Sequence, residues 1–385
     1  MNADRIQELR ELINHDSDGP VLSVFCRTDP RDPANNSETP AWSIALKNGL
    51  KEITASLNGD HGESETVKKL CAEAERRLVS ASAAQRGRSI AFFVGGSGTI
   101  DSMTTFQIPV RDNRVAIDAG PVIWPMLDVI ERGARTGLVL LSHDHIRLLE
   151  WADGIARDLE ESTFDLELGD WHQYRGPARP QGISGGHGVS HVASYDDRVK
   201  EWRARFVKAA AKAIADSATD LGFERLVVAA EGDLGKEFES AIPDSLRQRI
   251  ACIVPTNLID MTAADAAAHL DPHLREAWKK SACEVADEAL ERVQAAGRGA
   301  GGADEVLLAL GEGRVEHLVF DPYLETEDES LSDAARQAIA DAGESSVQEA
   351  LAELALRTDA RISSASIEEV PALAESGGVL ALLRY

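Results

Sequence analysis

The spacing of apolar residues along the first third of the chain alternates between strand-like and helix-like patterns. Two six-residue apolar runs, Val21–Cys26 and Ser89–Val94, are too short for helices and predict buried strands. Between them, apolar residues recur every three or four positions over about 39–57 and 64–83, which predicts two helices. Shorter strands are expected near 105–108 and 114–117, before a helix at 123–132. This part of the chain is therefore predicted to be a layered α/β domain.

The alternation of strands and helices continues to the end of the chain. The apolar runs at 137–141 and 145–151 are separated by three polar residues and predict a hairpin. Strands alternating with helices predict sheets covered by helices, so the whole chain is expected to be of the α/β class. The further strands are predicted at 225–230, 250–254, 317–320, 361–366 and 379–383, and the longest helix at 271–296.

The length of 385 residues exceeds what one domain usually takes, and a glycine-rich segment at 297–302 predicts a linker. We therefore expect three domains, each a layered α/β unit. They are an N-terminal domain at 1–135, a central domain at 136–297, and a C-terminal α/β/α sandwich at 298–385. The sequence has no long apolar heptad repeat of the kind that forms a coiled coil. We expect a monomer whose three domains move relative to one another about the joints near 135 and at 297–302.

Charge and cysteine content limit the function classes. The chain carries 65 acidic and 40 basic residues, a formal net charge of −25, so any contact with RNA must be local. No apolar run approaches 18 residues, and we expect a cytoplasmic protein without a signal peptide or membrane span. The four cysteines form no CxxC pair, and His143 and His145 have no obvious third ligand nearby. We expect neither a metal nor a cofactor.

One segment reverses the sign of the charge. Residues 172–213 combine a loop containing the pair Gly185-Gly186, followed by His187, with a helix predicted from about Tyr195. Eight basic residues against three acidic ones give this segment a local charge of +5. A glycine loop joined to a basic helix is suited to a phosphate-rich environment. The basic residues are Arg175, Arg179, Arg198, Lys200, Arg203, Arg205, Lys208 and Lys212.

Helical spacing separates the predicted helix into two faces. Val199, Trp202, Phe206, Ala210 and Ile214 share one stripe, which predicts a core face. The opposite stripe carries Arg198, Arg205, Lys208 and Lys212 together with Glu201. A plain solvated face with a Glu201–Arg205 ion pair is one interpretation of this stripe. RNA binding is the other, and the glycine loop upstream and the acidic background favour it.

Several segments, taken in chain order, resemble one known superfamily. They are SIAFFVGGSGTIDS, TGLVLLSHDHIRLLEW, GISGGHGVSH with the basic helix after it, FERLVVAAEGDLGKEF, ADEVLLALGEGRVEHLVF and the ending SGGVLALLRY. In this order they are similar to the archaeal and eukaryotic peptide-chain release factor and Pelota superfamily, including its bacterial relatives. The resemblance implies a three-domain release-factor-like architecture whose central domain carries the functional loop.

Two departures from the superfamily pattern affect the expected function. His187 stands where the family has the glutamine of its Gly-Gly-Gln loop, and no Asn-Ile-Lys-Ser motif occurs in the first domain. The absence of the Asn-Ile-Lys-Ser motif argues against stop-codon recognition. The resemblance implies that Gly185, Gly186 and His187 are the candidate catalytic residues, because the loop's backbone N–H groups can orient water or an oxyanion. The candidate RNA-binding residues are Arg175, Arg179, Arg198, Arg205, Lys208 and Lys212.

Three functions remain open at the level of sequence. The first is a ribosome-binding translation factor that acts in rescue or hibernation at the tRNA entry site. The second is a peptidyl-tRNA hydrolase that frees nascent chains from stalled ribosomes, and the third is an RNA- or protein-binding adaptor outside the ribosome. The expected partners are the rRNA and tRNA site of the ribosome and a translational GTPase that would contact the C-terminal domain. Whether the Gly-Gly-His loop catalyses hydrolysis is left open.

Overall fold

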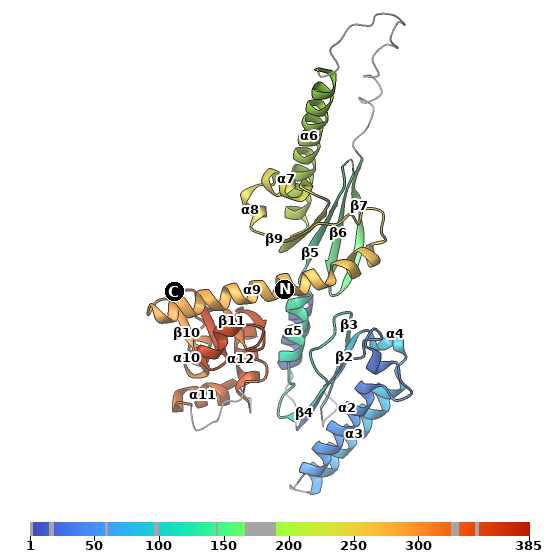
Figure 1. Ribbon diagram of the computed structural model, residues 1–385. Helices are drawn as coiled ribbons and strands as arrows, with labels where there is room; N and C mark the ends of the chain where they lie inside the picture. The colour runs from blue at the N-terminus through green and yellow to red at the C-terminus, as the bar shows by residue number, and fades with distance from the viewer. Residues whose placement is uncertain are drawn as a thin grey trace, which may run out of the picture. The chain divides into compact units, whose positions relative to one another are not determined.

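The computed structural model describes residues 3–14, 19–57, 61–95, 100–143, 145–165, 190–324, 331–342 and 346–385. The chain forms two compact units, one of residues 1–134 with 278–385 and the other of residues 135–277 (Figure 1). The described residues form three separate sheets, and the predicted α/β class is confirmed. The division into three domains at 135 and 297 stays a prediction.

The N-terminal sheet of the first unit has the order β3-β2-β1-β4, and each neighbouring pair is antiparallel. Alternate side chains of β1 and β2 pack with α2 and α3 in one core, as their apolar patterns predict. The strand predicted near 105–108 lies at 101–106 instead, because its polar start pairs as an edge strand. The elements are β1 (Val21–Cys26), η1 (Pro33–Asn35), α2 (Ala41–Ser56), α3 (His61–Ser80), α4 (Ala83–Arg86), β2 (Ser89–Gly95), β3 (Asp101–Phe106) and β4 (Arg114–Asp118).

The second face of this sheet is also buried. Phe25 and Phe93 lie on it and meet edge to face, with their ring centroids 5.7 Å apart. The hydroxyl of Ser23, on the same face, accepts a hydrogen bond from the Val122 backbone N–H at 3.0 Å. The segment that leads into α5 (Trp124–Arg132) therefore crosses this face. Leu9 of α1 (Ala3–Ile13) is buried as well, and the sheet lies between two layers of helices.

The C-terminal sheet, also in the first unit, has the order β10-β13-β11-β12, in which only β11 and β12 run parallel. The second half of α9 (Ala263–Gln294) packs against this sheet through Trp278 and three alanines. The prediction of a linker at 297–302 is wrong in part, since Gly299–Gly301 forms β10 and pairs with β13. The remaining elements are α10 (Ala303–Gly311), β11 (Val315–Phe320), α11 (Asp333–Ala342), α12 (Val347–Arg357), β12 (Arg361–Ser364), η5 (Pro371–Ser376) and β13 (Val379–Leu383).

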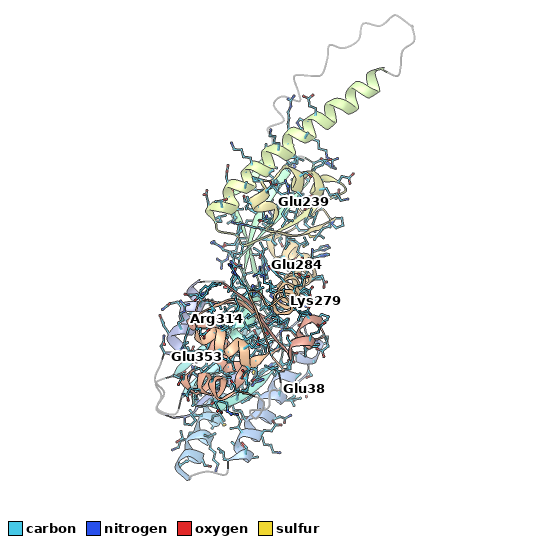
Figure 2. All side chains as sticks on the ribbon, turned by 90° about the vertical axis from the view of Figure 1, so that its left-hand side faces the viewer. Glu38, Glu239, Lys279, Glu284, Arg314 and Glu353 are labelled. Atoms are coloured by element: carbon cyan, nitrogen blue, oxygen red, sulfur yellow. The ribbon has the colours of Figure 1, made fainter. Side chains whose placement is uncertain are left out.

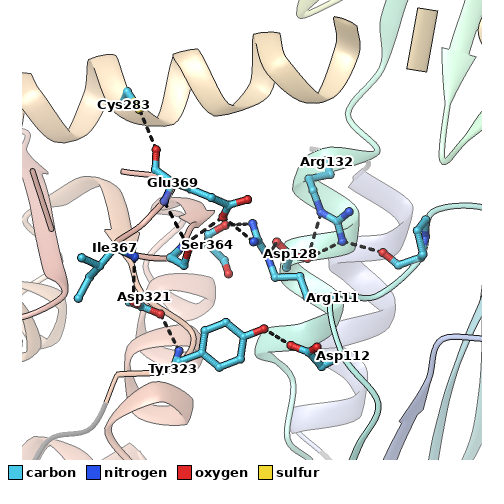
Figure 3. A network of polar contacts seen from close by, with 12 residues as sticks. Arg111, Asp112, Asp128, Arg132, Cys283, Asp321, Tyr323, Ser364, Ile367 and Glu369 are labelled. Carbon is cyan, nitrogen blue, oxygen red and sulfur yellow. Dashed lines mark hydrogen bonds and ion pairs between the residues drawn. The ribbon is translucent and has the colours of Figure 1, made fainter. Parts of the chain in front are cut away.

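The two sheets of the first unit are joined by a polar network around Arg111 (Figure 3). Its guanidinium contacts Asp128 of α5 at 3.0 Å, and it reaches Glu369 and the Ser364 carbonyl of the C-terminal segment at 2.6 Å each. It also lies 5.3 Å from the ring centroid of Trp278. A second contact joins the Tyr323 hydroxyl to the Asp112 carboxylate. Segments far apart in sequence thus form one compact body.

The second unit contains a five-stranded sheet with the order β7-β6-β5-β8-β9. The predicted hairpin is present as β5 and β6, and β7 extends it by a strand that the sequence did not reveal. Strands β5, β8 and β9 are parallel, and α6 and α7 cover them. The elements are β5 (Thr136–Leu141), β6 (His145–Ala152), β7 (Ile155–Asp165), α6 (Ser190–Asp220), β8 (Arg225–Ala230), α7 (Leu234–Ala241), α8 (Asp244–Arg247) and β9 (Ile250–Val254).

Helix α9 begins eight residues before its predicted start at 271, because Pro272 lies inside it instead of marking its first turn. The signal for the true start is Thr262. Its hydroxyl accepts the Asp265 N–H at 3.1 Å and donates to the Asp265 carboxylate at 2.6 Å, a reciprocal cap of the first turn. None of the helices in the described ranges has the length and apolar character that crossing a lipid bilayer requires.

Candidate functional site

Helix α6 is the described element that carries most of the predicted RNA-binding residues. It has 31 residues and is about 46 Å long at 1.5 Å per residue. Figure 1 shows its N-terminal end extending beyond the sheet of its own unit, while its C-terminal part lies on the sheet. The long helix therefore presents the residues near Ser190 away from the core that anchors it.

The core face of α6 agrees with the helical spacing of the sequence. Phe206, Ala210 and Ile214 are buried, as predicted, in the core between α6, α7 and the sheet. Trp202 is half-buried and stacks on Phe206, with the ring planes 8° apart and the centroids 6.1 Å apart. The buried face is wider than the predicted stripe, since Val207, Ala211 and Ala218 also lie in the core. The side chain of Val199 lies outside the described ones.

The opposite face of α6 is basic and exposed at Arg205, Lys208 and Lys212. Arg205 forms the expected ion pair with Glu201 at 2.5 Å, and the two side chains are 76% and 64% exposed. An ion pair this exposed is screened by water and contributes little to stability. The guanidinium of Arg205 can therefore leave Glu201 and bind another anion. The three cations lie on one stripe about 10 Å long. The term basic stripe below refers to Arg205, Lys208 and Lys212.

The charge on this face changes sign along the helix. Beyond Lys212 the exposed residues include Asp216 and Asp220, so the basic stripe is confined to the part of α6 nearer the glycine loop. Arg203, one of the eight basic residues of segment 172–213, has a different role. Its guanidinium pairs with Glu237 of α7 at 2.8 Å and joins two helices of the unit. No sequence spacing relates residues 203 and 237, so only the fold reveals this contact.

The rest of the predicted site is not placed. Arg175, Arg179, Gly185, Gly186 and His187 lie outside the described residues. The backbone of Arg198 belongs to α6, while its side chain lies outside the described ones. His187 precedes the first residue of α6 by three positions in the sequence. The structure therefore gives the helix that follows the loop, and the geometry of the loop stays a prediction.

The two histidines of the hairpin lie at its turn. His143 is exposed, and the backbone N–H of His145 donates to the Ser142 hydroxyl at 3.1 Å. Within the described ranges, no three His, Cys, Asp or Glu side chains are grouped so as to hold a metal ion. Charged side chains occur over both units, and Figure 2 labels examples on α7 and α9. These are Glu239, Lys279 and Glu284.

Comparison with known proteins finds a matching family model and a similar bacterial protein. Residues 121–277 match the family model described as bacterial archaeo-eukaryotic release factor family 10. The chain is also 23% identical over 253 residues to the uncharacterized protein YocB of Bacillus subtilis (strain 168), which covers 65% of this chain and 91% of YocB. The matched range ends at residue 277, where the second compact unit also ends.

Two solved structures illustrate the structural similarity. The archaeal translation termination factor aRF1 covers 99% of this chain and 97% of its own, at 15% identity and a TM-score of 0.27. Saccharomyces cerevisiae Dom34, a translation termination-like factor, covers 77% of this chain and 79% of its own, at 11% identity and a TM-score of 0.37. Both scores are low, and the assignment rests on the sequence match. Over residues 121–277 the chain is similar to the bacterial archaeo-eukaryotic release factors, and the resemblance expected from the sequence is confirmed.

Proposed function

We propose that this protein is a ribosome-binding translation factor that acts in ribosome rescue or hibernation at the tRNA entry site. One observation carries the proposal: the release-factor family model matches the unit that presents the basic stripe. The unit has an exposed row of cations in a chain of net charge −25. A local row of cations on an acidic protein favours binding to one phosphate-rich site over coating of nucleic acid.

The physical basis of binding is counterion release. Each lysine or arginine that neutralises a phosphate releases a condensed cation, so affinity falls as salt rises. Lys208 and Lys212 lie one helical turn apart and are both exposed, which allows each to contact a phosphate without losing a contact in the core. Arg175, Arg179 and Arg198 would extend the contact toward the loop. Delivery by a translational GTPase through the C-terminal segment is part of this proposal.

Salt-dependent cosedimentation with ribosomes tests the proposal. Lys212→Glu is compared with Lys236→Glu, which makes the same charge change on an exposed position of α7. We expect the first variant to bind more weakly, with its slope of log affinity against log salt reduced by about one unit. The second variant should bind as the unaltered protein does. An affinity that does not change with salt, or an equal loss in both variants, would contradict the proposal.

Hydrolysis of peptidyl-tRNA is the alternative activity of the same unit. The pair Gly185-Gly186 would supply backbone N–H donors near the ester, and neutral imidazole at His187 could order the attacking water. We expect binding without efficient hydrolysis, because imidazole differs in shape and donor set from the amide around which the family site is built. Release of peptide from loaded ribosomes distinguishes the two activities, and an adaptor outside the ribosome would show neither binding nor release.

A further inference from the structure

One end of the C-terminal sheet carries an arginine on each of its four strands. The strand order is β10-β13-β11-β12, and β13 runs antiparallel to the other three. The starts of β10, β11 and β12 therefore lie at the same end of the sheet as the last residue of β13. At this end an arginine directly precedes β10 and β11, directly follows β13, and is the first residue of β12. In strand order the four residues, called the arginine row below, are Arg298, Arg384, Arg314 and Arg361.

Backbone pairing holds the arginine row in place. The Leu383 N–H donates to the Arg298 carbonyl at 3.0 Å, and the Arg384 N–H donates to the Arg314 carbonyl at 2.8 Å. Arg361 is the first residue of β12 that pairs with β11. Because neighbouring strands lie about 4.8 Å apart, the four backbone positions span about 14 Å across the sheet.

The charge of the row is largely without a counter-charge. Arg298, Arg361 and Arg384 are exposed, and in the described ranges no carboxylate pairs with any of them. The guanidinium of Arg298 reaches only a carbonyl, that of Arg384, at 3.5 Å. Arg314 is 33% exposed and pairs with Glu312 at 2.5 Å. Three of the four guanidinium groups can therefore attract an external anion.

The guanidinium of Arg384 is fixed in position by neutral acceptors. It donates to the carbonyls of Gly313, Thr358 and Asp359 at 3.1, 2.9 and 3.1 Å. Thr358 is the C-cap residue of α12, so these bonds satisfy carbonyls at a helix end. The helix end carries about half a negative charge, which offsets only part of the guanidinium charge. Two of the five N–H donors of Arg384 remain for another acceptor.

The carboxylates beside the row are mostly paired already. Asp359 pairs with Arg10 of α1, and Glu312 pairs with Arg314. Glu316 of β11 is exposed, and the unpaired guanidinium groups of the row outnumber it. The row therefore keeps an excess of positive charge on a chain whose net charge is −25, and it attracts an anionic partner.

We propose that the arginine row binds the sugar–phosphate backbone of a single-stranded RNA, with an unpaired base stacked on the ring of Tyr385. A guanidinium presents two N–H groups in one plane, which match two oxygens of a phosphate. Tyr385 directly follows Arg384 and is 68% exposed, so its ring is open to a base. An acidic peptide would match the charges but has no planar base for this ring. The row lies in the first unit and the basic stripe in the second, and the inference does not depend on the proposed function.

The probe is a fluorescently labelled ten-nucleotide oligouridylate, titrated into the full chain at increasing salt. The chain carries Lys208→Ala and Lys212→Ala throughout, so that most of the basic stripe cannot contribute to binding. Arg298→Gln combined with Arg361→Gln should reduce the slope of log affinity against log salt by about 1.4 units, the effect of two phosphate contacts with a single strand. At about 0.1 M salt this change corresponds to a roughly 25-fold loss of affinity.

A matched pair of variants controls for the change in net charge. Arg76→Gln combined with Arg336→Gln removes two exposed arginines of α3 and α11, which are remote from the row in the sheet order. This pair should bind the oligouridylate as the parent chain does. No binding of the oligouridylate to the parent chain, or equal losses in the two double variants, would overturn the proposal.

The stacked base is tested at Tyr385. Tyr385→Ala should weaken the oligouridylate about tenfold, the effect of one lost stack, and Tyr385→Phe keeps the ring and should bind within about twofold. An oligoglutamate peptide of the same charge should bind much more weakly and should not respond to Tyr385→Ala. Oligoglutamate that binds as tightly as the oligouridylate, or an oligouridylate that does not respond to Tyr385→Ala, would contradict RNA as the partner.

Discussion

The buried carboxyl group of Glu349 in α12 accepts a hydrogen bond from the backbone N–H of Ile123 at 2.9 Å. Ile123 is the N-cap residue of α5 and has no cap from its own side chain. A helix of the C-terminal sheet thus satisfies a backbone donor at the start of a helix of the N-terminal sheet. The carboxyl oxygen lies where the partial positive charge of the α5 N-terminus favours an acceptor.

This relationship predicts that the first unit is less stable at alkaline pH. Burial raises the pKa of Glu349 from 4.5 to about 8, against the opposing effects of the Ile123 and Trp124 N–H groups and the nearby Arg114, while Asp118 adds to the rise. Because the pKa of Glu349 is higher in the folded state than in the unfolded state, protonation of Glu349 stabilises the fold. This contribution to the free energy of unfolding is full below about pH 4.5 and is lost as the pH rises through about 8. Glu349→Gln stays neutral, so its thermal unfolding midpoint should fall less than that of the unaltered protein between pH 6 and pH 9. Glu291→Gln, at an exposed position of α9, should leave the pH dependence unchanged.

Removal of the Arg111 side chain should strongly destabilise the first unit. The guanidinium is 15% exposed and pairs with Asp128, whose own side chain is 1% exposed. Arg111→Ala would leave a buried carboxylate with Arg132 as its remaining ion partner, and we expect a loss of about 3–5 kcal/mol in the free energy of unfolding. Denaturant titration measures this loss. Arg336→Ala, which breaks an exposed pair within α11, should cost less than about 1 kcal/mol, and equal effects would refute the structural role of Arg111.

Truncation of Phe206 should separate the stability of the second unit from the charge of its surface. Its side chain is 1% exposed and packs in the core that joins α6 to the sheet. Phe206→Ala should lower the free energy of unfolding by about 3–5 kcal/mol, by loss of apolar burial and formation of a cavity. Lys208→Ala, one half-turn away on the exposed face, should change stability by less than about 0.5 kcal/mol while weakening ribosome binding. Hydrogen exchange of the α6 amides would locate the effect.

Three loop variants decide whether the protein is an enzyme. If peptide release occurs through backbone positioning, Gly186→Ala should abolish it, because a Cβ limits the approach and the positive φ angles of the loop. His187→Gln should then raise release or leave it unchanged, and His187→Ala should lower it only if imidazole orders the water. Ribosome binding should persist in all three variants. Rapid release by the unaltered protein that is lost in His187→Ala would establish hydrolysis and contradict our preference for binding alone.

The elements that the sequence revealed are those with a continuous apolar run or a clear helical stripe. β1, β2, β5 and β8 are buried along almost their whole length, so their composition alone marks them. β3 was misplaced because an edge strand keeps polar side chains on both faces. β10 was taken for a linker because its glycines serve close packing: a Cβ on Gly299 would lie 2.7 Å from the Ala289 carbonyl of α9. Such an approach depends on tertiary structure, which no local pattern encodes.

The candidate site was predictable to the extent that it depends on helical periodicity. The buried Phe206 and the exposed Lys208 and Lys212 follow directly from positions along one helix. The pairing of Arg203 with Glu237 depends on how α7 returns to α6 after β8, and the sequence contains no signal for that approach. The acidic end of the stripe, at Asp216, was visible in the sequence, but its meaning needed the position of the helix on the sheet.

The contact between Glu349 and Ile123 has a consequence for the order in which the nascent protein acquires its structure. The two residues are 226 positions apart, so the N-terminal segment leaves the ribosomal exit tunnel long before its cap has been synthesised. At about 5–20 residues per second, this interval lasts about 10–45 s. The apolar face that α5 and α12 later share must stay uncovered or be protected by chaperones during that time. Residues 135–277 form a unit from one continuous stretch of chain and can complete their fold within the same interval.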